Sequence, residues 1–224
     1  MDYTKIFDLF VKKDPILFNV WMTKPFINEM DGNVWATDGH AAAIVAMDVA
    51  GLQYNKLEKK LAIPCELPTE KHIHLLSDQI REAVEKCPKD EIMEEKEVKC
   101  KECDGTGKVL WEYSASTKFE SYDHEYDCPV CDGDGSIYEE VGTGRYEPAK
   151  KSGVRIGEAV FSAWQLDRIL KTMDIIGVNT IDIISEPHPS KATMFRINNH
   201  IKVIQMPMLA DDLKNIINFP NDPL

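Results

Sequence analysis

The sequence contains no long hydrophobic run and no excess of basic residues. No apolar run approaches the roughly 20 residues that a membrane-spanning helix needs, and the first residues lack the charged and then apolar pattern of a secretory leader. We therefore expect a soluble, cytoplasmic protein without membrane contact. The formal net charge is −12, which disfavours sequence-independent attraction to nucleic-acid phosphates, because that attraction depends on Lys and Arg.

Common catalytic motifs are also missing. There is no serine nucleophile elbow, no glycine-rich phosphate loop before a Lys-Ser/Thr pair, and no metal motif with an open position. Cys65 has no neighbour that would activate it, and we interpret Cys65 and Cys87 as reduced, buried or idle thiols. His72 and His74 would share one face of a strand, but no acidic or cysteine partner is adjacent in sequence. We expect a non-enzymatic protein with no catalytic residues and no small-molecule substrate.

What the sequence does contain is a repeated cysteine motif. The pattern C-x-x-C-x-G-x-G occurs at positions 100–107 and again at 128–135. Two Cys-x-x-Cys turns can bring four thiolates to one point, which is the closed shell that Zn²⁺ prefers in structural sites. Glycines with positive φ let backbone N–H groups point at the thiolates. The spacing favours one zinc ion over disulfides, with these ligands: Cys100, Cys103, Cys128 and Cys131.

The two repeats resemble the zinc finger of DnaJ-type chaperones over about positions 98–137. That family has four repeats, so the resemblance implies one zinc ion per chain here instead of two. No His-Pro-Asp tripeptide of a J-domain is present. Between Met93 and Lys151 there are fifteen acidic and eight basic residues, which favours a finger that faces protein or is purely structural. The resemblance also implies an alternative function, a chaperone-like protein that binds unfolded polypeptide through the finger.

Hydrophobic periodicity predicts a helix-plus-strands unit before the finger and another after it. The apolar stripe of residues 3–10 predicts a helix that ends at Asp14-Pro15, and Ser77 is expected to cap a second helix that stops at Pro88. A capping box at residues 162–165 and Gly177 bracket a third helix. Strands are expected at residues 16–22, 34–37, 43–47, 61–63, 180–185, 192–198 and 201–206.

The finger is expected to contain a hairpin with arms at residues 109–113 and 119–126, in which Trp111 serves packing. Residues 89–99 are expected to be a solvated connector into the finger, and residues 142–144 and 148–153 lead out of it. The predicted fold class is α+β: two helix-plus-strands half-domains form one domain, into which a small zinc-binding hairpin is inserted. The predicted segments are 1–92 and 152–210 for the domain, 93–151 for the finger and 211–224 for a C-terminal tail.

Three stretches resemble bacterial DNA polymerase sliding clamps, the β subunit. V-W-A-T-D-G-H-A at positions 34–41 resembles the clamp stretch A-T-D-G-H-R-L, and V-I-Q-M-P-M-L at 203–209 resembles V-x-M-P-M-R-L. P-I-L-F-N-V at 15–20 resembles the strand entry P-x-L-x-N-V. The clamp fold is built from repeated helix-and-sheet half-domains, so the resemblance implies the order of elements that the periodicity predicts.

In clamps, the first two stretches line a hydrophobic pocket that binds short peptides of polymerases and other partners. The resemblance therefore implies a partner-peptide pocket formed by Thr37, Gly39, His40, Met206, Pro207, Met208 and Leu209. Ala41 and Leu209 stand where clamps have Arg, so the rim lacks two cations. An alternative is that residues 206–208 are only core at a strand end.

The chain carries enough sequence for one clamp-like domain, whereas a clamp subunit has three. DNA contact is therefore expected only through an oligomeric ring or a partner. The expected function is a zinc-binding, clamp-like module that recruits protein partners in DNA replication or repair.

Overall fold

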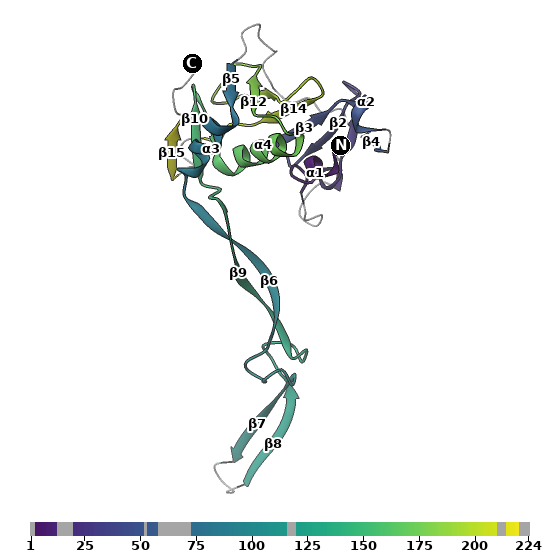
Figure 1. The fold of residues 1–224 in the computed structure, drawn as a ribbon. Coiled ribbons are helices and arrows are strands. Elements are labelled where there is room, and N and C mark those ends of the chain that lie inside the picture. Colours follow the sequence, from purple (N-terminus) through teal and green to yellow (C-terminus); the bar gives the residue numbers. More distant parts are fainter. Residues whose placement is uncertain are drawn as a thin grey trace. The chain divides into compact units, whose positions relative to one another are not determined.

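The computed structural model describes residues 3–12, 20–51, 53–57, 73–115, 120–209 and 214–219. The chain forms two compact units, one from Met1–Asp90 together with Pro148–Leu224 and the other from Glu91–Glu147. The first unit contains helices together with runs of mostly antiparallel strands (Figure 1), so the predicted α+β class is confirmed. In the described residues, no helix is long and apolar enough to span a membrane.

An eight-stranded sheet forms the centre of the first unit. Its strands lie in the order β4-β1-β2-β3-β14-β13-β12-β5, and all neighbours are antiparallel except β1 and β4. The bounds are β4 (Lys56–Leu57), β1 (Phe26–Asn28), β2 (Val34–Thr37), β3 (Ala41–Val45), β14 (Ile201–Gln205), β13 (Thr193–Arg196), β12 (Thr180–Ile183) and β5 (Ile73–Leu76).

The pairing of β3 with β14 joins the two predicted half-domains into one sheet. Ala41 pairs with Gln205 at one end of this ladder and Val45 pairs with Ile201 at the other. Strands β1 to β3 come from the first half of the chain, and β12 to β14 come from the second. This pairing therefore places the residues before Ala41 next to the residues after Gln205.

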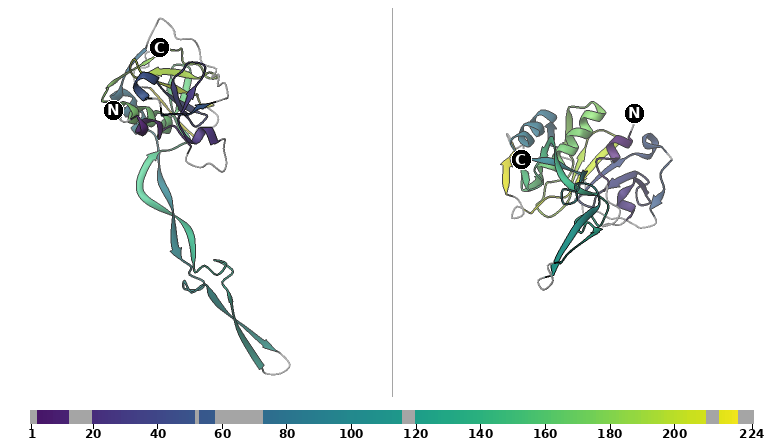
Figure 2. Two further views of the ribbon diagram at one scale, coloured as in Figure 1. Left: turned by 90° about the vertical axis from the view of Figure 1, so that its right-hand side faces the viewer. Right: turned by 90° about the horizontal axis from the view of Figure 1, so that it is seen from below.

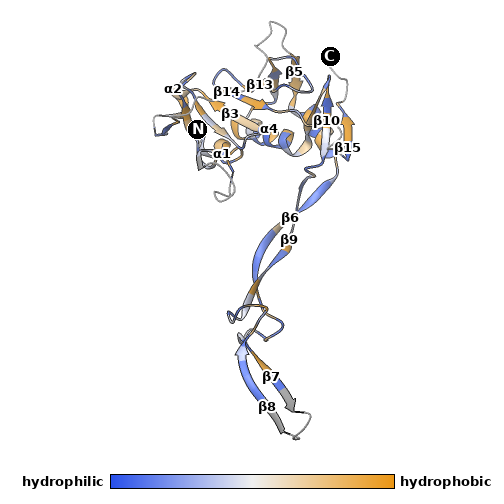
Figure 3. Ribbon diagram, turned by 180° about the vertical axis from the view of Figure 1, so that it is seen from behind, coloured by the Kyte–Doolittle hydropathy of each residue, from blue (hydrophilic) through white to orange (hydrophobic). Residues whose placement is uncertain are grey.

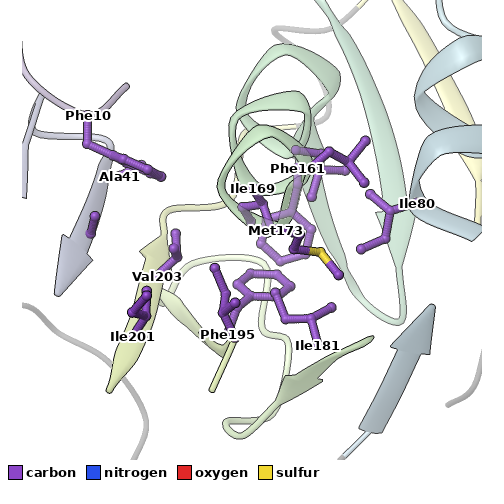
Figure 4. Close-up of a cluster of buried hydrophobic side chains, with 14 of the residues drawn as sticks. Phe10, Ala41, Ile80, Phe161, Ile169, Met173, Ile181, Phe195, Ile201 and Val203 are labelled. Carbon is purple, nitrogen blue, oxygen red and sulfur yellow. The ribbon is translucent and has the colours of Figure 1, made fainter. Parts of the chain in front are cut away.

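The main core lies on one face of this sheet, beneath α4 (Ala163–Ile176) and α3 (Ser77–Glu85). Successive side chains of a strand point to opposite faces of the sheet. In β2, Val34 and Ala36 therefore point into the main core, whereas Trp35 packs on the other face in a smaller cluster with Phe26 and Ile204. In Figure 4, Ile169 and Met173 of α4 lie over Phe195 and Ile181 of the sheet. Both sheet faces are therefore covered around β2 and β3.

A second sheet of three strands also packs against α4. Its order is β11-β10-β15, with β11 (Ala159–Ser162), β10 (Ser152–Ile156) and β15 (Asn215–Asn218). β15 runs parallel to β10, and Phe219 is buried in the core. Part of the segment predicted as a C-terminal tail is thus a strand of the first unit. Two views of these elements are given in Figure 2.

The second unit contains two strand pairs and the cysteine turns. β6 (Lys89–Lys99) pairs with β9 (Ser136–Pro148), and β7 (Lys108–Ala115) pairs with β8 (Glu120–Asp127). The β7–β8 pair confirms the predicted hairpin. Most of β6 and β8 is hydrophilic in Figure 3.

Residues 89–99, predicted as a solvated connector into the finger, are solvated but also form a strand, β6, which the sequence did not predict. All its side chains are exposed or half-buried, so the strand has no buried face and no alternation of apolar residues to reveal it. Residues 142–144 were expected to lead out of the finger but lie inside β9. Cross-strand contacts hold this pair, since Thr143 Oγ1 donates to the Ile92 carbonyl and Gly144 N to the Glu91 carboxylate.

Several helix predictions need correction at their ends. α1 covers only Thr4–Phe7, although Phe10 further along the stripe is buried. The capping box of α4 does not form, because Ser162 is the N-cap residue but its side chain makes no capping hydrogen bond. Leu76, not Ser77, precedes α3, and Gln79 accepts a hydrogen bond from its backbone N–H. Gly177 ends α4 in the left-handed conformation, as predicted.

Other differences concern the first strands. Of the strand expected at residues 16–22, Val20–Thr23 is a 3-10 helix, η1, and residues 16–19 lie outside the described residues. Residues 46–47 leave the predicted strand and begin α2 (Met47–Ala50). The strand expected at 61–63, Cys65, His72 and most of the clamp-like stretch at 15–20 also lie outside the described residues.

Candidate functional site

The first candidate site is formed by the four cysteines of the repeated motif in the second unit. Their Sγ atoms all lie within 4.8 Å of one another, and the Cys100–Cys128 and Cys103–Cys131 sulfurs are each 3.8 Å apart. A disulfide would need about 2.05 Å. Four sulfurs placed tetrahedrally at about 2.3 Å from Zn²⁺ are separated by about 3.8 Å. The cluster could therefore hold one metal ion, and its geometry fits tetrahedral coordination.

The two turns that carry the cysteines repeat each other in detail. Gly107 N donates to Cys103 Sγ over 3.3 Å, and Gly135 N donates to Cys131 Sγ over 3.2 Å. Each turn also hydrogen bonds to the other, since Cys100 N donates to Gly135 O and Cys128 N to Gly107 O. The glycines of the motif thus supply donors to two thiolates, as the sequence predicts.

The second glycine of each motif is fixed by close backbone approach. Gly107 has φ of +74°, and a Cβ atom on it would lie 2.1 Å from the Gly133 carbonyl oxygen. A Cβ on Gly135, with φ of +78°, would lie 2.6 Å from the Gly105 carbonyl oxygen. Only glycine fits at these two positions, because both the conformation and the available space exclude a side chain.

The thiols are buried, with at most 6% of any cysteine exposed. Burial opposes ionisation, but the Gly107 N–H and the neighbouring thiols lower the pKa of Cys103 to about 7. The pKa of Cys131 is raised to about 11, by burial and by the thiols beside it. A cation at the centre would favour the thiolate form of all four groups.

The second candidate site is a pocket of the first unit with a volume of about 330 Å³. It lies where β3 pairs with β14, and the N-terminal turn of α4 forms another wall. Its lining residues are His40, Lys150, Ser162, Trp164, Gln165, Met206, Pro207, Met208 and Leu209. Five of the seven predicted pocket residues are therefore brought together here.

The segment 206–209 is fixed by its backbone. Met206 N donates to His40 O over 2.9 Å, and Met208 N donates to the Val160 carbonyl of β11 over 2.8 Å. The side chains of residues 206–208 are half-buried, and Leu209 is 66% exposed. A rigid backbone thus presents an apolar, partly solvated surface.

The other two predicted residues, Thr37 and Gly39, do not line the pocket. Thr37 is buried, and its hydroxyl donates to Ala41 O and accepts from Gly39 N. Gly39 has φ of +91°, and Asp38 accepts hydrogen bonds from the N–H groups of His40 and Ala41. These residues shape the turn that places His40 at the pocket.

Asp38 also anchors this turn to α4. Its Oδ2 accepts a hydrogen bond from Arg168 Nη1 over 2.6 Å, and both side chains are nearly buried. Burial alone would raise the pKa of Asp38, but the Arg168 charge and the two N–H donors lower it below its ordinary value. The Arg168 guanidinium contacts two rings, 4.5 Å from the Phe10 centroid and 4.7 Å from that of Trp164. It therefore links the turn to the Trp164 wall.

Sequence reasoning did not find four lining residues: Lys150, Ser162, Trp164 and Gln165. Three of them belong to the segment that was interpreted only as a helix start, and no clamp-like motif contains them. The helix predicted to begin at residues 162–165 is the signal that could have placed them, had it been expected to pack beside the two clamp-like motifs. His74, by contrast, contacts Asp182 from the adjacent strand, an acidic partner that is distant in sequence.

Comparison with solved structures finds bacterial DNA polymerase sliding clamps. The clamp of Pseudomonas aeruginosa is 13% identical with a TM-score of 0.42, and the match covers 93% of this chain and 65% of that chain. The clamps of Helicobacter pylori and Bacillus subtilis are each 10% identical, with a TM-score of 0.42 and coverage of 93% and 63%. This chain resembles sliding clamps. It spans less than two thirds of the length of those clamp chains.

The resemblance to sliding clamps that the sequence predicts is thus also found in the structure. No family model matches the sequence, and no curated protein matches it. The likeness of the cysteine repeats to the DnaJ finger stays a prediction, and the alternative function as a chaperone gains no support from these comparisons.

Proposed function

We propose that this protein is a non-enzymatic, clamp-like module that binds one zinc ion and recruits protein partners in DNA replication or repair. The observation that carries the proposal is the pocket at the β3–β14 junction. Two segments separated by more than 150 residues in sequence, His40 and Met206–Leu209, come together there with Trp164.

The chemistry of the pocket suits a short peptide with large apolar side chains. Its volume lies at the lower end of the range of ligand sites, about 300–1,000 Å³. The flexible thioethers of Met206 and Met208 can adapt to different apolar side chains. Lys150 is the cation at this pocket, with Nζ 5.8 Å from the centroid of the Trp164 ring. A peptide that combines leucine or phenylalanine with an acidic residue is therefore the proposed ligand class.

Zinc has a structural role in this proposal. The second unit has few buried apolar side chains besides the cysteines, which pack with Val109 and Ile137. A closed four-thiolate site leaves no coordination position for a substrate. The ion, held by Cys100, Cys103, Cys128 and Cys131, would stabilise the fold of the second unit. DNA would be reached through a partner or through an oligomeric ring.

The test is calorimetric titration of the zinc-loaded protein with a synthetic peptide that contains Asp, Leu and Phe. We expect saturable binding with one site per chain. Leu209→Ser should weaken binding by about 5- to 30-fold, the equivalent of about 1–2 kcal/mol of lost apolar burial. Met30→Ser is the matched control, because Met30 is 59% exposed and does not line the pocket.

Absence of saturable binding would refute the proposed pocket. Equal effects of Leu209→Ser and Met30→Ser would show that the peptide binds elsewhere.

A further inference from the structure

The β7–β8 hairpin of the second unit has an aromatic face. Trp111 pairs with His124 and Val109 pairs with Tyr126, and residues directly opposite each other in a sheet share a face. The ring of Tyr126 makes edge contacts with both others, at 6.1 Å to Trp111 and 4.8 Å to His124. Trp111 is nevertheless 60% exposed and Tyr126 54% exposed. Trp111 therefore packs within the hairpin, as predicted, and also presents much of its ring to solvent.

The opposite face of the hairpin is acidic. Its pairs are Lys108 with Asp127, Leu110 with Glu125, and Glu112 with Asp123. The ammonium group of Lys108 is paired with Asp127, so the described charges of this face leave three carboxylates in excess. The hairpin therefore carries a net negative charge, which attracts a cationic partner.

The same combination of exposed apolar side chains and negative charge characterises the whole second unit. Residues 91–147 hold sixteen acidic and six basic residues, so they carry ten of the twelve net negative charges of the chain. Of the eleven large hydrophobic side chains exposed among the described residues, eight belong to this unit: Met93, Leu110, Trp111, Tyr126, Val130, Tyr138, Val141 and Tyr146. The second unit therefore combines exposed apolar side chains with most of the chain's negative charge.

We propose that the aromatic face of the β7–β8 hairpin, formed by Val109, Trp111, His124 and Tyr126, binds an arginine-rich segment of a partner protein. A guanidinium group can stack on the Trp111 and Tyr126 rings through cation–π attraction, and the negative charge of the unit attracts the cationic segment as a whole. Lysine would fit less well, because its ammonium group is a compact, strongly hydrated charge.

Charge selects this occupant over two others. An aromatic strand face can also stack single-stranded nucleic acid, but such sites combine the rings with a basic groove, and this unit is acidic. A second copy of the same hairpin would bring like charges together, which opposes self-association. The opposite charge of an arginine-rich segment is complementary to the unit. This surface is separate from the pocket of the first unit, so the two proposals can fail independently.

The experiment measures fluorescence anisotropy of a labelled ten-residue peptide of alternating Arg and Ser, titrated with the zinc-loaded full-length protein. Matched peptides carry Lys, Gln or Glu in place of Arg. We expect the Arg peptide to bind, the Lys peptide to bind several-fold more weakly, and the Gln and Glu peptides not to bind. Affinity for the Arg peptide should fall as salt is raised, because the attraction is partly between exposed charges.

Two variants separate stacking on the rings from general attraction to the acidic unit. Trp111→Ser retains every charge and should weaken binding of the Arg peptide by about tenfold. Leu110→Ser changes a residue of similar exposure, 59%, on the opposite face and should alter binding less than twofold. Zinc content measured for both variants checks that the unit has formed.

Four results would overturn the proposal. They are equal binding of the Arg and Lys peptides, equal effects of the two substitutions, saturable binding of single-stranded oligothymidine to this face, and dimerisation that Trp111→Ser abolishes in light scattering.

Discussion

Replacing Gly107 by alanine should nearly abolish zinc binding, whereas the same change at Gly105 should only weaken it. Both glycines have left-handed backbones, with φ of +74° and +76°. A non-glycine residue in that region costs about 1–2 kcal/mol. If the folded, metal-bound state bears this cost, zinc affinity falls by about 5- to 30-fold at either position.

The difference between the two positions comes from what a Cβ atom would meet. At Gly105 the nearest atoms belong to the Lys99 side chain, which can rotate away into solvent. At Gly107 the Cβ would lie 2.1 Å from the Gly133 carbonyl oxygen, whereas close C–H···O contacts have carbon–oxygen distances of about 3.3–3.6 Å. One of the two turns must therefore move by about 1 Å, because neither contacting group is a flexible side chain.

That movement disrupts two hydrogen bonds of Gly107. Its N–H donates to Cys103 Sγ over 3.3 Å, and its carbonyl accepts from Cys128 N over 2.8 Å. A hydrogen bond to a charged group is worth about 1.5–3 kcal/mol, and an unpaired buried donor costs about 1–3 kcal/mol. Together these losses exceed the effect of Gly105→Ala by about 3 kcal/mol or more, equivalent to more than about 100-fold in zinc affinity.

The assay is competition for zinc between each variant and a chromophoric chelator under reducing conditions. Gly135→Ala should behave like Gly107→Ala, because its Cβ would meet the Gly105 carbonyl in the equivalent contact. If Gly107→Ala and Gly105→Ala reduce zinc affinity to the same extent, the close approach of the two turns does not control the site.

Three further predictions concern the metal ligands and the buried ion pair. Cys128→Ser should reduce the zinc content from one ion per chain to almost none, measured by metal analysis after gel filtration, because three thiolates no longer close the shell; retention of stoichiometric zinc would disprove this ligand set. Arg168→Met should lower the free energy of unfolding by about 3–5 kcal/mol in urea titrations, since it leaves the Asp38 carboxylate buried without its partner; a loss below 1 kcal/mol would contradict the pairing. The pKa of Asp38 is lowered in the folded protein, so its carboxylate stabilises the fold above the unfolded-state pKa of about 3.9, and this stabilisation is lost as the pH falls through the folded-state pKa. The difference in free energy of unfolding between the native protein and Asp38→Asn should therefore shrink below about pH 4. A difference that grows on acidification would mean that folding raises the pKa of Asp38.

The sequence predicts those parts of the fold that one segment specifies by itself. The apolar stripe of Leu166, Ile169, Leu170 and Met173 predicts α4 because every member of it faces the core, and Gly177 ends the helix through its own conformation. The metal cluster is predictable for the same reason, since each Cys-x-x-Cys turn carries half of its ligands. Nothing in β6 reveals a strand, because both of its faces are solvated.

The pocket was predictable only in part. The clamp-like motifs identify His40 and residues 206–209, but the walls that Trp164 and Gln165 add depend on how α4 docks on the sheet. The ion pair of Asp38 and Arg168 joins residues 130 positions apart. No local pattern links these two residues, and in the sequence Asp38 with Gly39 looks like an ordinary turn.

Ala149 N donates a hydrogen bond to Pro88 O over 2.8 Å. This bond joins the two places in the first unit where the chain leaves for residues 91–147 and returns from them. The ends of the inserted segment are therefore neighbours in the first unit whether or not the segment is folded. A long insertion between neighbouring ends adds little to the entropy of closing the chain, about 0.6 kcal/mol for each doubling of its length. The finger is in this sense modular, because replacing it by a tight turn would leave the order of strands in the sheet unchanged. Whole modules can be gained, lost or exchanged at such a position during evolution without changes to the rest of the domain.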